Sequence, residues 1–238
     1  MTPQPALQSY TKQHLKRLFI SGDDSDVTVV ATSRQYALHH IHVCPRSPVF
    51  LKNCHFKKDH QPDTTLSPAH RNLAKCGGLL DLSPEDPHAV DCLLHFLYLD
   101  DYNPSSYSAE LQARDPAQEQ KGSPSHDNER TENHPLLLHA RVSALAECYD
   151  IPELKQLALS KFKAATPPRW LDIEDVPGFL AVVREVYTST RDSDVNLRAA
   201  VANIFHEHTK QLLRVREVQN MLVEHGALGR DILLQSIL

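Results

Sequence analysis

The chain has 238 residues, a net charge of −5 at pH 7 and 41% hydrophobic residues. This length suffices for one medium domain with an extension, or for two small domains. The slight negative charge gives the chain no electrostatic reason to bind a phosphate backbone, so we expect no nucleic-acid partner.

Cysteine usage and hydropathy predict the cellular compartment of the protein. Its five cysteines include no Cys-x-x-Cys pair, which favours a reducing compartment, cytoplasmic or nuclear. We see no secretory leader and no apolar run long enough to span a bilayer, so we expect no membrane partner.

The first 56 residues predict a helix, a hairpin and a second helix. Residues 7–20 form an amphipathic pattern whose apolar side includes Leu15, Leu18 and Phe19. The β-branched residues in 27–30 predict a strand, residues 33–35 a tight turn and residues 36–38 a second short strand. Ser47 is predicted to cap a helix over residues 49–54.

The middle of the chain alternates between ordered and polar stretches. Residues 57–78 predict a long loop, and residues 79–82 predict a short buried strand. Asp86 followed by Pro87 is typical of a helix start, since the carboxylate caps free N–H groups. Residues 103–134 are rich in Ser, Pro, Gln, Asn and Glu, which predicts a disordered insertion.

From residue 136 onward the apolar periodicity is helical. Pro152 begins a second helix of this region, and residues 166–168 form a rigid break. Three or four more amphipathic helices follow, including one assigned Leu212, Val218, Met221 and Leu222. We therefore expect an all-α C-terminal part.

The strongest chemical candidate is the run from His39 to Cys44, with three histidines and a cysteine. Its spacing matches no zinc pattern, so a metal-binding protein or enzyme built on it is only an alternative. Cys148 is predicted to be an inert core thiol. With neither a Gly-x-Ser-x-Gly elbow nor a Gly-rich phosphate loop, we expect no enzyme, catalytic residue, metal or cofactor.

Several short motifs follow one another in a fixed order. They are Ser-Asp-Val-Thr-Val at 25–29, His39, Cys-Pro-Arg-Ser-Pro-Val-Phe at 44–50, Leu-Asp-Leu at 80–82, the helix after Asp86, and Ala-Glu-Cys-Tyr-Asp-Ile at 146–151. As a set they resemble the BTB/POZ domain in the form common in fungal proteins.

The resemblance implies an α+β fold, with a small mixed sheet flanked by helices and an all-α C-terminal extension. It implies three parts. They are an N-terminal amphipathic helix at 1–20, a domain at 21–165 that contains the loop 57–78 and the insertion 103–134, and a helical extension at 166–238.

The resemblance also implies a non-enzymatic protein–protein interaction module or scaffold that self-associates, often as a homodimer. In this chain the interface would involve Leu15, Leu18, Phe19, Ile41 and Val43. A helix with one apolar side supplies the self-complementary patch that a two-fold dimer needs. The alternative, that this helix folds onto its own domain, stays open.

Two further residue sets follow from the resemblance. Relatives that dimerise often hold a basic residue where this chain has His40, so a pairing of His40 with Asp26 would titrate near neutral pH. Some BTB proteins are substrate adaptors that recruit a cullin scaffold of ubiquitin ligases through a hydrophobic–x–acidic motif. The segment from Leu99 to Asp101 resembles that motif, so a ligase adaptor is the second hypothesis.

Overall fold

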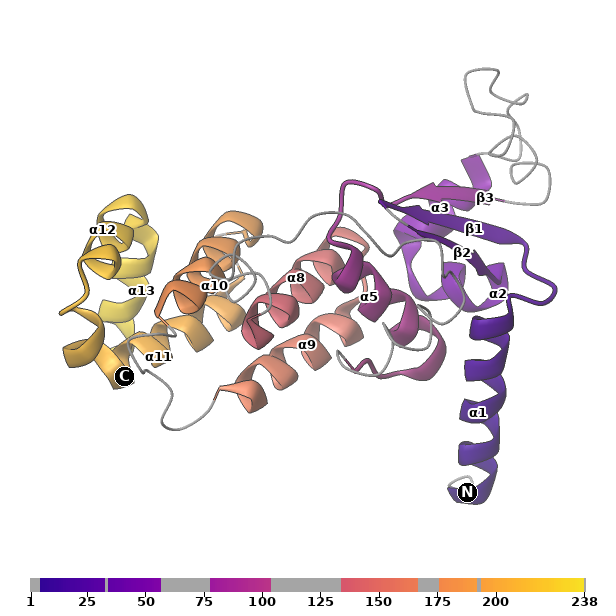
Figure 1. The fold of residues 1–238 in the computed structure, drawn as a ribbon, viewed down its shortest axis with the longest axis horizontal. Helices are drawn as coiled ribbons and strands as arrows, with labels where there is room; N and C mark the ends of the chain where they lie inside the picture. The colour runs from indigo at the N-terminus through magenta and orange to yellow at the C-terminus, as the bar shows by residue number, and fades with distance from the viewer. Residues whose placement is uncertain are drawn as a thin grey trace, which may run out of the picture. The chain divides into compact units, whose positions relative to one another are not determined.

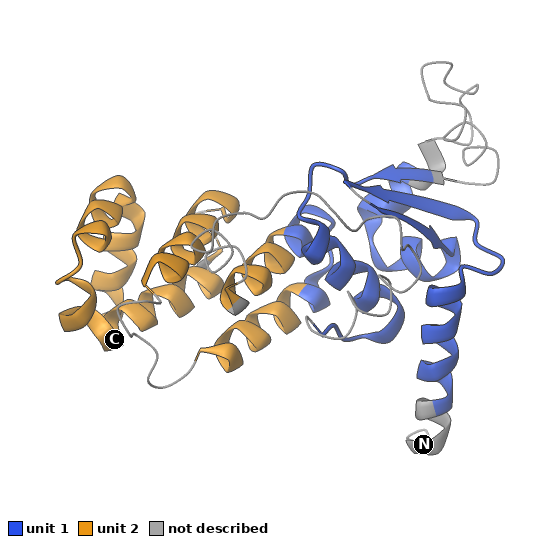
Figure 2. Cartoon of the chain, viewed as in Figure 1, with its two compact units in different colours: residues 1–119, 145–154 blue, residues 120–144, 155–238 orange. Residues whose placement is uncertain are grey.

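The computed structural model describes residues 5–32, 34–56, 78–103, 134–166, 176–191 and 194–237. Within these ranges the fold is mixed α+β, as predicted, with many helices and one small mixed sheet (Figure 1). The chain divides into two compact units, residues 1–119 with 145–154 (unit 1) and residues 120–144 with 155–238 (unit 2), as Figure 2 shows. Two of the three dividing points fall inside α8 (Pro135–Cys148) and α9 (Pro152–Ala165), before the domain end predicted at residue 165.

The sheet of unit 1 is built around β1 (Val27–Ala31). β2 (Arg34–Leu38) pairs with β1 antiparallel, and β3 (Gly78–Asp81) pairs with it parallel. Burial alternates along β1, whose Val27, Val29 and Ala31 side chains are buried. The tight turn predicted at 33–35 is wrong in part, because Arg34 and Gln35 belong to β2 and pair with Ala31 and Val30.

The helices of unit 1 are α1 (Pro5–Ser21), α2 (His40–Val43), the short 3-10 helix η1 (Cys44–Arg46), α3 (Pro48–Phe56) and α5 (Pro87–Leu99). Three of them, α1, α3 and α5, were predicted from the sequence, whereas α2 and η1 were not. Ser47 Oγ accepts the Phe50 N–H at 3.1 Å, which confirms its capping role. Asp86 likewise accepts the Ala89 N–H at 2.8 Å at the start of α5.

The described part of unit 2 is helical and has its own apolar core. Besides most of α8 and α9, it contains α10 (Val176–Ser189), α11 (Val195–Leu212), α12 (Arg216–Glu224) and α13 (Gly226–Gln235). Its buried side chains include Phe162, Phe179, Val183, Val201, Phe205, Val218 and Met221. Leu212 ends α11 rather than joining the following helix, which corrects the predicted assignment.

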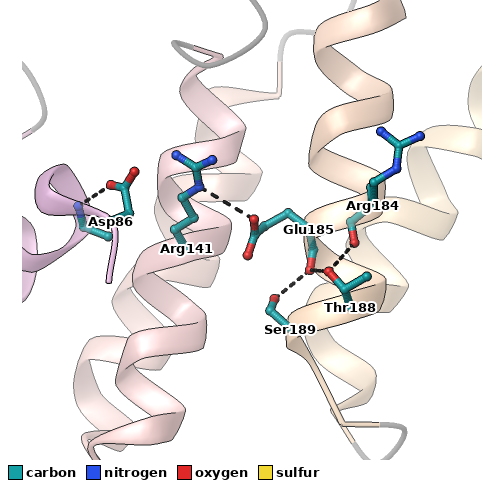
Figure 3. A network of polar contacts seen from close by, with 7 residues as sticks. Asp86, Arg141, Arg184, Glu185, Thr188 and Ser189 are labelled. Carbon is teal, nitrogen blue, oxygen red and sulfur yellow. Dashed lines mark hydrogen bonds and ion pairs between the residues drawn. The ribbon is translucent and has the colours of Figure 1, made fainter. Parts of the chain in front are cut away.

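Polar contacts also join the helices of unit 2. Arg141 of α8 lies 3.6 Å from the carboxylate of Glu185 on α10, as Figure 3 shows. In the last turn of α10, the hydroxyls of Thr188 and Ser189 donate back to carbonyls one turn earlier (Figure 3). The Arg141 and Glu185 side chains are partly exposed, so we expect this ion pair to add less than about 1 kcal/mol.

Two predicted segments lie outside the described residues, and one predicted core residue is exposed. The long loop at 57–78 and the insertion at 103–134 lie almost entirely outside the described residues. The core-thiol prediction for Cys148 is wrong, because this residue ends α8 and is exposed. Its apolar neighbours in sequence suggested burial, but the helix ends at this residue.

Candidate interaction surface

The base of α1 is attached to α5 through Phe19. The Phe19 ring is 6% exposed, and its centroid lies 4.8 Å from that of Tyr98 and 6.4 Å from that of His95. Leu15 and Leu18 are half-buried on the same helix. Burying one large apolar side chain contributes about 2 kcal/mol. Phe19, which was predicted to lie in a dimer interface, therefore packs inside its own unit, on Tyr98 and His95.

The outer turns of α1 have a different environment. Figure 1 shows α1 extending away from the sheet of unit 1. Tyr10 is 71% exposed, and the side chains of residues 11–14 are exposed as well. In α2, Ile41 is 75% exposed whereas Val43 is fully buried. Tyr10 and Ile41 are therefore accessible apolar groups on unit 1, and Val43 belongs to its core.

Tyr98 and His39 form a buried polar pair between α5 and the end of β2. The Tyr98 hydroxyl accepts the His39 backbone N–H at 2.9 Å and lies 2.8 Å from Nδ1 of the imidazole. Nε2 lies 2.6 Å from the carbonyl of Asp23, which can only accept. In the neutral imidazole, Nε2 therefore carries the proton and Nδ1 accepts from the Tyr98 hydroxyl. Burial raises the pKa of Tyr98, an effect that the hydrogen bond from His39 partly offsets.

Asp26 contacts His40 through the main chain. Asp26 Oδ1 accepts the backbone N–H of His40 at 2.6 Å. His40 is the first residue of α2, and the preceding His39 makes no side-chain capping bond. Asp26 thus caps α2 from the segment before β1. The predicted titration assumed a bond to the imidazole, whereas this bond depends on the carboxylate and not on the His40 ring.

The run from His39 to Cys44 makes internal contacts. Both ring nitrogens of His39 have the partners given above, and Cys44 is 1% exposed. The ring of His42 lies 5.1 Å from that of Tyr98. Burial, and then the charges of His39 and Arg46, lower the pKa of His42. In the ranges that the structure describes, no group of three or more His, Cys, Asp or Glu side chains is placed to hold a metal ion.

The C-terminal end of α5 carries the residues predicted to contact a cullin scaffold. Leu99 is half-buried, and Asp100 and Asp101 are exposed. Asp100 ends the helix with a φ of 58° and forms a 2.7 Å ion pair with Arg46. Arg46 also donates to two carbonyls of the last turn of α5, at 3.1 Å each. These contacts fix the conformation of the segment from Leu99 to Asp101, which we call the corner after α5.

The sequence analysis missed a buried polar network between β2 and α5. Asp91 is 8% exposed and accepts hydrogen bonds from the Tyr36 hydroxyl and, at 3.1 Å, from Arg34. Burial raises the pKa of Asp91, although Tyr36 and Arg34 act in the opposite direction. Burial and the charge of Asp91 raise the pKa of Tyr36. An acidic residue within an otherwise apolar helix was the available signal.

The sequence matches no protein-family model, and a search of curated proteins finds no match either. Among the described residues, no helix combines the length and the apolar composition that crossing a bilayer requires. The candidate interaction surface of unit 1 therefore consists of the accessible apolar groups of α1 and α2 and the corner after α5.

Proposed function

We propose that the chain is a non-enzymatic protein–protein interaction module of the BTB/POZ type with a helical C-terminal extension, and that it forms homodimers through α1 and α2. The observation that carries the proposal is the exposure of Tyr10 and Ile41, at 71% and 75%. Aromatic and aliphatic side chains of this size often anchor protein interfaces.

The order of elements in unit 1 supports the BTB/POZ assignment. A hairpin is followed by the buried His39, a helix capped by Ser47, a strand parallel to β1 and a helix capped by Asp86. This is the order in which the motifs that resemble the family occur in the sequence. The base of α1 packs on its own unit while its outer turns are exposed, so one helix serves both intramolecular and intermolecular contact.

Self-association is tested by light scattering coupled to size-exclusion chromatography. At tens of micromolar we expect a mass of twice 26.8 kDa. Ile41→Asp places a charge in the proposed interface and should shift the chain toward the monomer. The control is Val223→Asp, since Val223 is 85% exposed on α12 in unit 2. A wild-type mass of one chain at this concentration would contradict the proposal.

A second candidate function is recruitment of a cullin scaffold, which the corner after α5 favours. Leu99 is half-buried, and the acidic Asp101 lies two residues further on at the surface. A binding assay with the purified scaffold should show loss of binding in the double variant Leu99→Ala/Asp101→Lys. Lack of binding by the wild-type chain would exclude this function without affecting self-association.

A further inference from the structure

Charge is distributed unequally between α1 and the rest of the chain. The segment Pro5–Ser21 contains Lys12, Lys16 and Arg17 and no acidic residue. Removing these three positive charges from the net −5 leaves −8 on the remaining sequence. Lys12 and Arg17 are exposed. The helix that extends from unit 1 is thus a basic element on an acidic protein.

Two acidic turns lie at the base of α1. Asp23, Asp24 and Asp26 follow α1 directly, whereas Asp100 and Asp101 follow α5, and all five are exposed. Hydrogen bonds through His39 connect the turn after α1 to α5, the helix that the second acidic turn follows. The imidazole of His39 bonds both the Asp23 carbonyl and the hydroxyl of Tyr98 on α5.

The acidic turn after α5 also contacts the residues of α5 on which the base of α1 packs. His95 bonds the carbonyl of Asp101 at 2.7 Å. Phe19 of α1 packs on both His95 and Tyr98. The base of α1 therefore lies beside two acidic turns, in one of which Asp100 pairs with Arg46, whereas Lys12 is in the outer part of the helix.

Lys12 lies too far along α1 to be neutralised by these turns of the same chain. Nine residue steps lead from Lys12 to Ser21, the last residue of α1, and at 1.5 Å per residue this part of the helix axis accounts for about 13.5 Å. This distance exceeds the Debye length of about 8 Å at physiological ionic strength. In a two-fold dimer with antiparallel α1 helices, the basic turns of each helix would approach the acidic turns of the other copy, and the contact would occur twice.

We propose that α1 docks by charge complementarity on a second copy of this chain, with its Lys12 and Arg17 side chains facing the acidic turns after α1 and α5 of that copy. This inference rests on the proposed self-association and names the electrostatic contact that orients it. Complementary charge mainly raises the association rate and selects the partner, and its effect falls as salt rises.

A charge-swap experiment tests this contact, with dissociation constants measured by analytical ultracentrifugation. One variant, Lys12→Glu/Arg17→Glu, reverses the basic side. The other, Asp23→Lys/Asp24→Asn, changes the summed charge of the five aspartates from −5 to −2, with Asn at residue 24 because its φ of 59° suits Asn. The control, Lys210→Glu/Arg214→Glu, reverses two exposed charges of unit 2. Far-UV circular dichroism checks that every variant is folded.

We expect each interface variant to self-associate at least about tenfold more weakly than the wild type. The equimolar mixture of the two should associate more tightly than Lys12→Glu/Arg17→Glu alone, because one of the two contacts in the mixed dimer is the wild-type contact. The control should match the wild type. Wild-type association should weaken by about tenfold between about 50 mM and about 500 mM salt. Dimers that persist in either interface variant, or a mixture that fails to associate, would overturn this contact and leave self-association standing. A wild type that is monomeric throughout would instead refute the proposed function itself.

Discussion

Replacing Tyr98 by Phe should destabilise unit 1 by about 2 to 4 kcal/mol. The Tyr98 side chain is 2% exposed, and the new ring keeps its packing on Phe19 and His42. The variant loses one oxygen and with it the partner of two buried groups of His39, namely its backbone N–H at 2.9 Å and its Nδ1 at 2.8 Å.

The magnitude follows from counting these two groups. A buried donor or acceptor left without a hydrogen bond costs about 1 to 3 kcal/mol. His39 is 6% exposed, so water reaches the site only in part, and we take the lower half of the range for each group. Because folded domains are stable by only about 5 to 15 kcal/mol, a loss of this size is readily measured.

Two measurements separate a local effect from a global one. Urea unfolding, followed by far-UV circular dichroism, gives the change in the free energy of unfolding. Amide hydrogen exchange should accelerate in peptides from β2 and α5 and stay unchanged in peptides from α11. Tyr10→Phe is the control, because Tyr10 is 71% exposed and its change should stay within about 0.5 kcal/mol. A Tyr98→Phe variant as stable as this control would refute the hydrogen-bonding scheme deduced for His39.

Two further substitutions probe the backbone and a buried histidine. Gly22→Ala should cost about 2 kcal/mol, because Gly22 ends α1 with a φ of 66° and an added Cβ would lie 2.9 Å from Cβ of Ala37. Gly229→Ala, which meets no atom within 4 Å inside α13, should leave urea stability equal or higher. Burial, with a smaller contribution from Lys161, lowers the pKa of His139 from 6.5 to about 4. Between these values the unfolded chain binds the proton and the folded chain does not, so stability should fall as pH decreases through this window, by up to about 3 kcal/mol. In His139→Gln the loss between pH 7 and pH 4 should be smaller by this amount, and an identical loss would show that His139 is not the group responsible.

Local patterns in the sequence were sufficient to predict several of the elements. The alternating valines predicted β1, the Asp-Pro pair predicted the start of α5, and Ser47 predicted the start of α3, because periodicity and capping act within a few residues. The same reasoning failed at Cys148, whose exposure depends on where α8 ends.

The site residues were predictable only in part. The sequence indicated an apolar side of α1, but it could not show that Phe19 packs on its own unit while Tyr10 is exposed. Burial of a helical residue depends on which element packs against each turn, and this is not encoded by the periodicity of one helix. Asp91 was missed for the same reason, since its partners Arg34 and Tyr36 lie on a strand more than fifty residues earlier.

The sequence alone therefore determined the type and order of most helices and strands, the acidic net charge and the basic character of α1. Only the tertiary structure decided that Tyr98 meets His39, 59 residues away, and that Asp26 caps α2. Propensity, periodicity and capping act between neighbours along the chain, whereas these contacts exist only once the sheet and helices have packed.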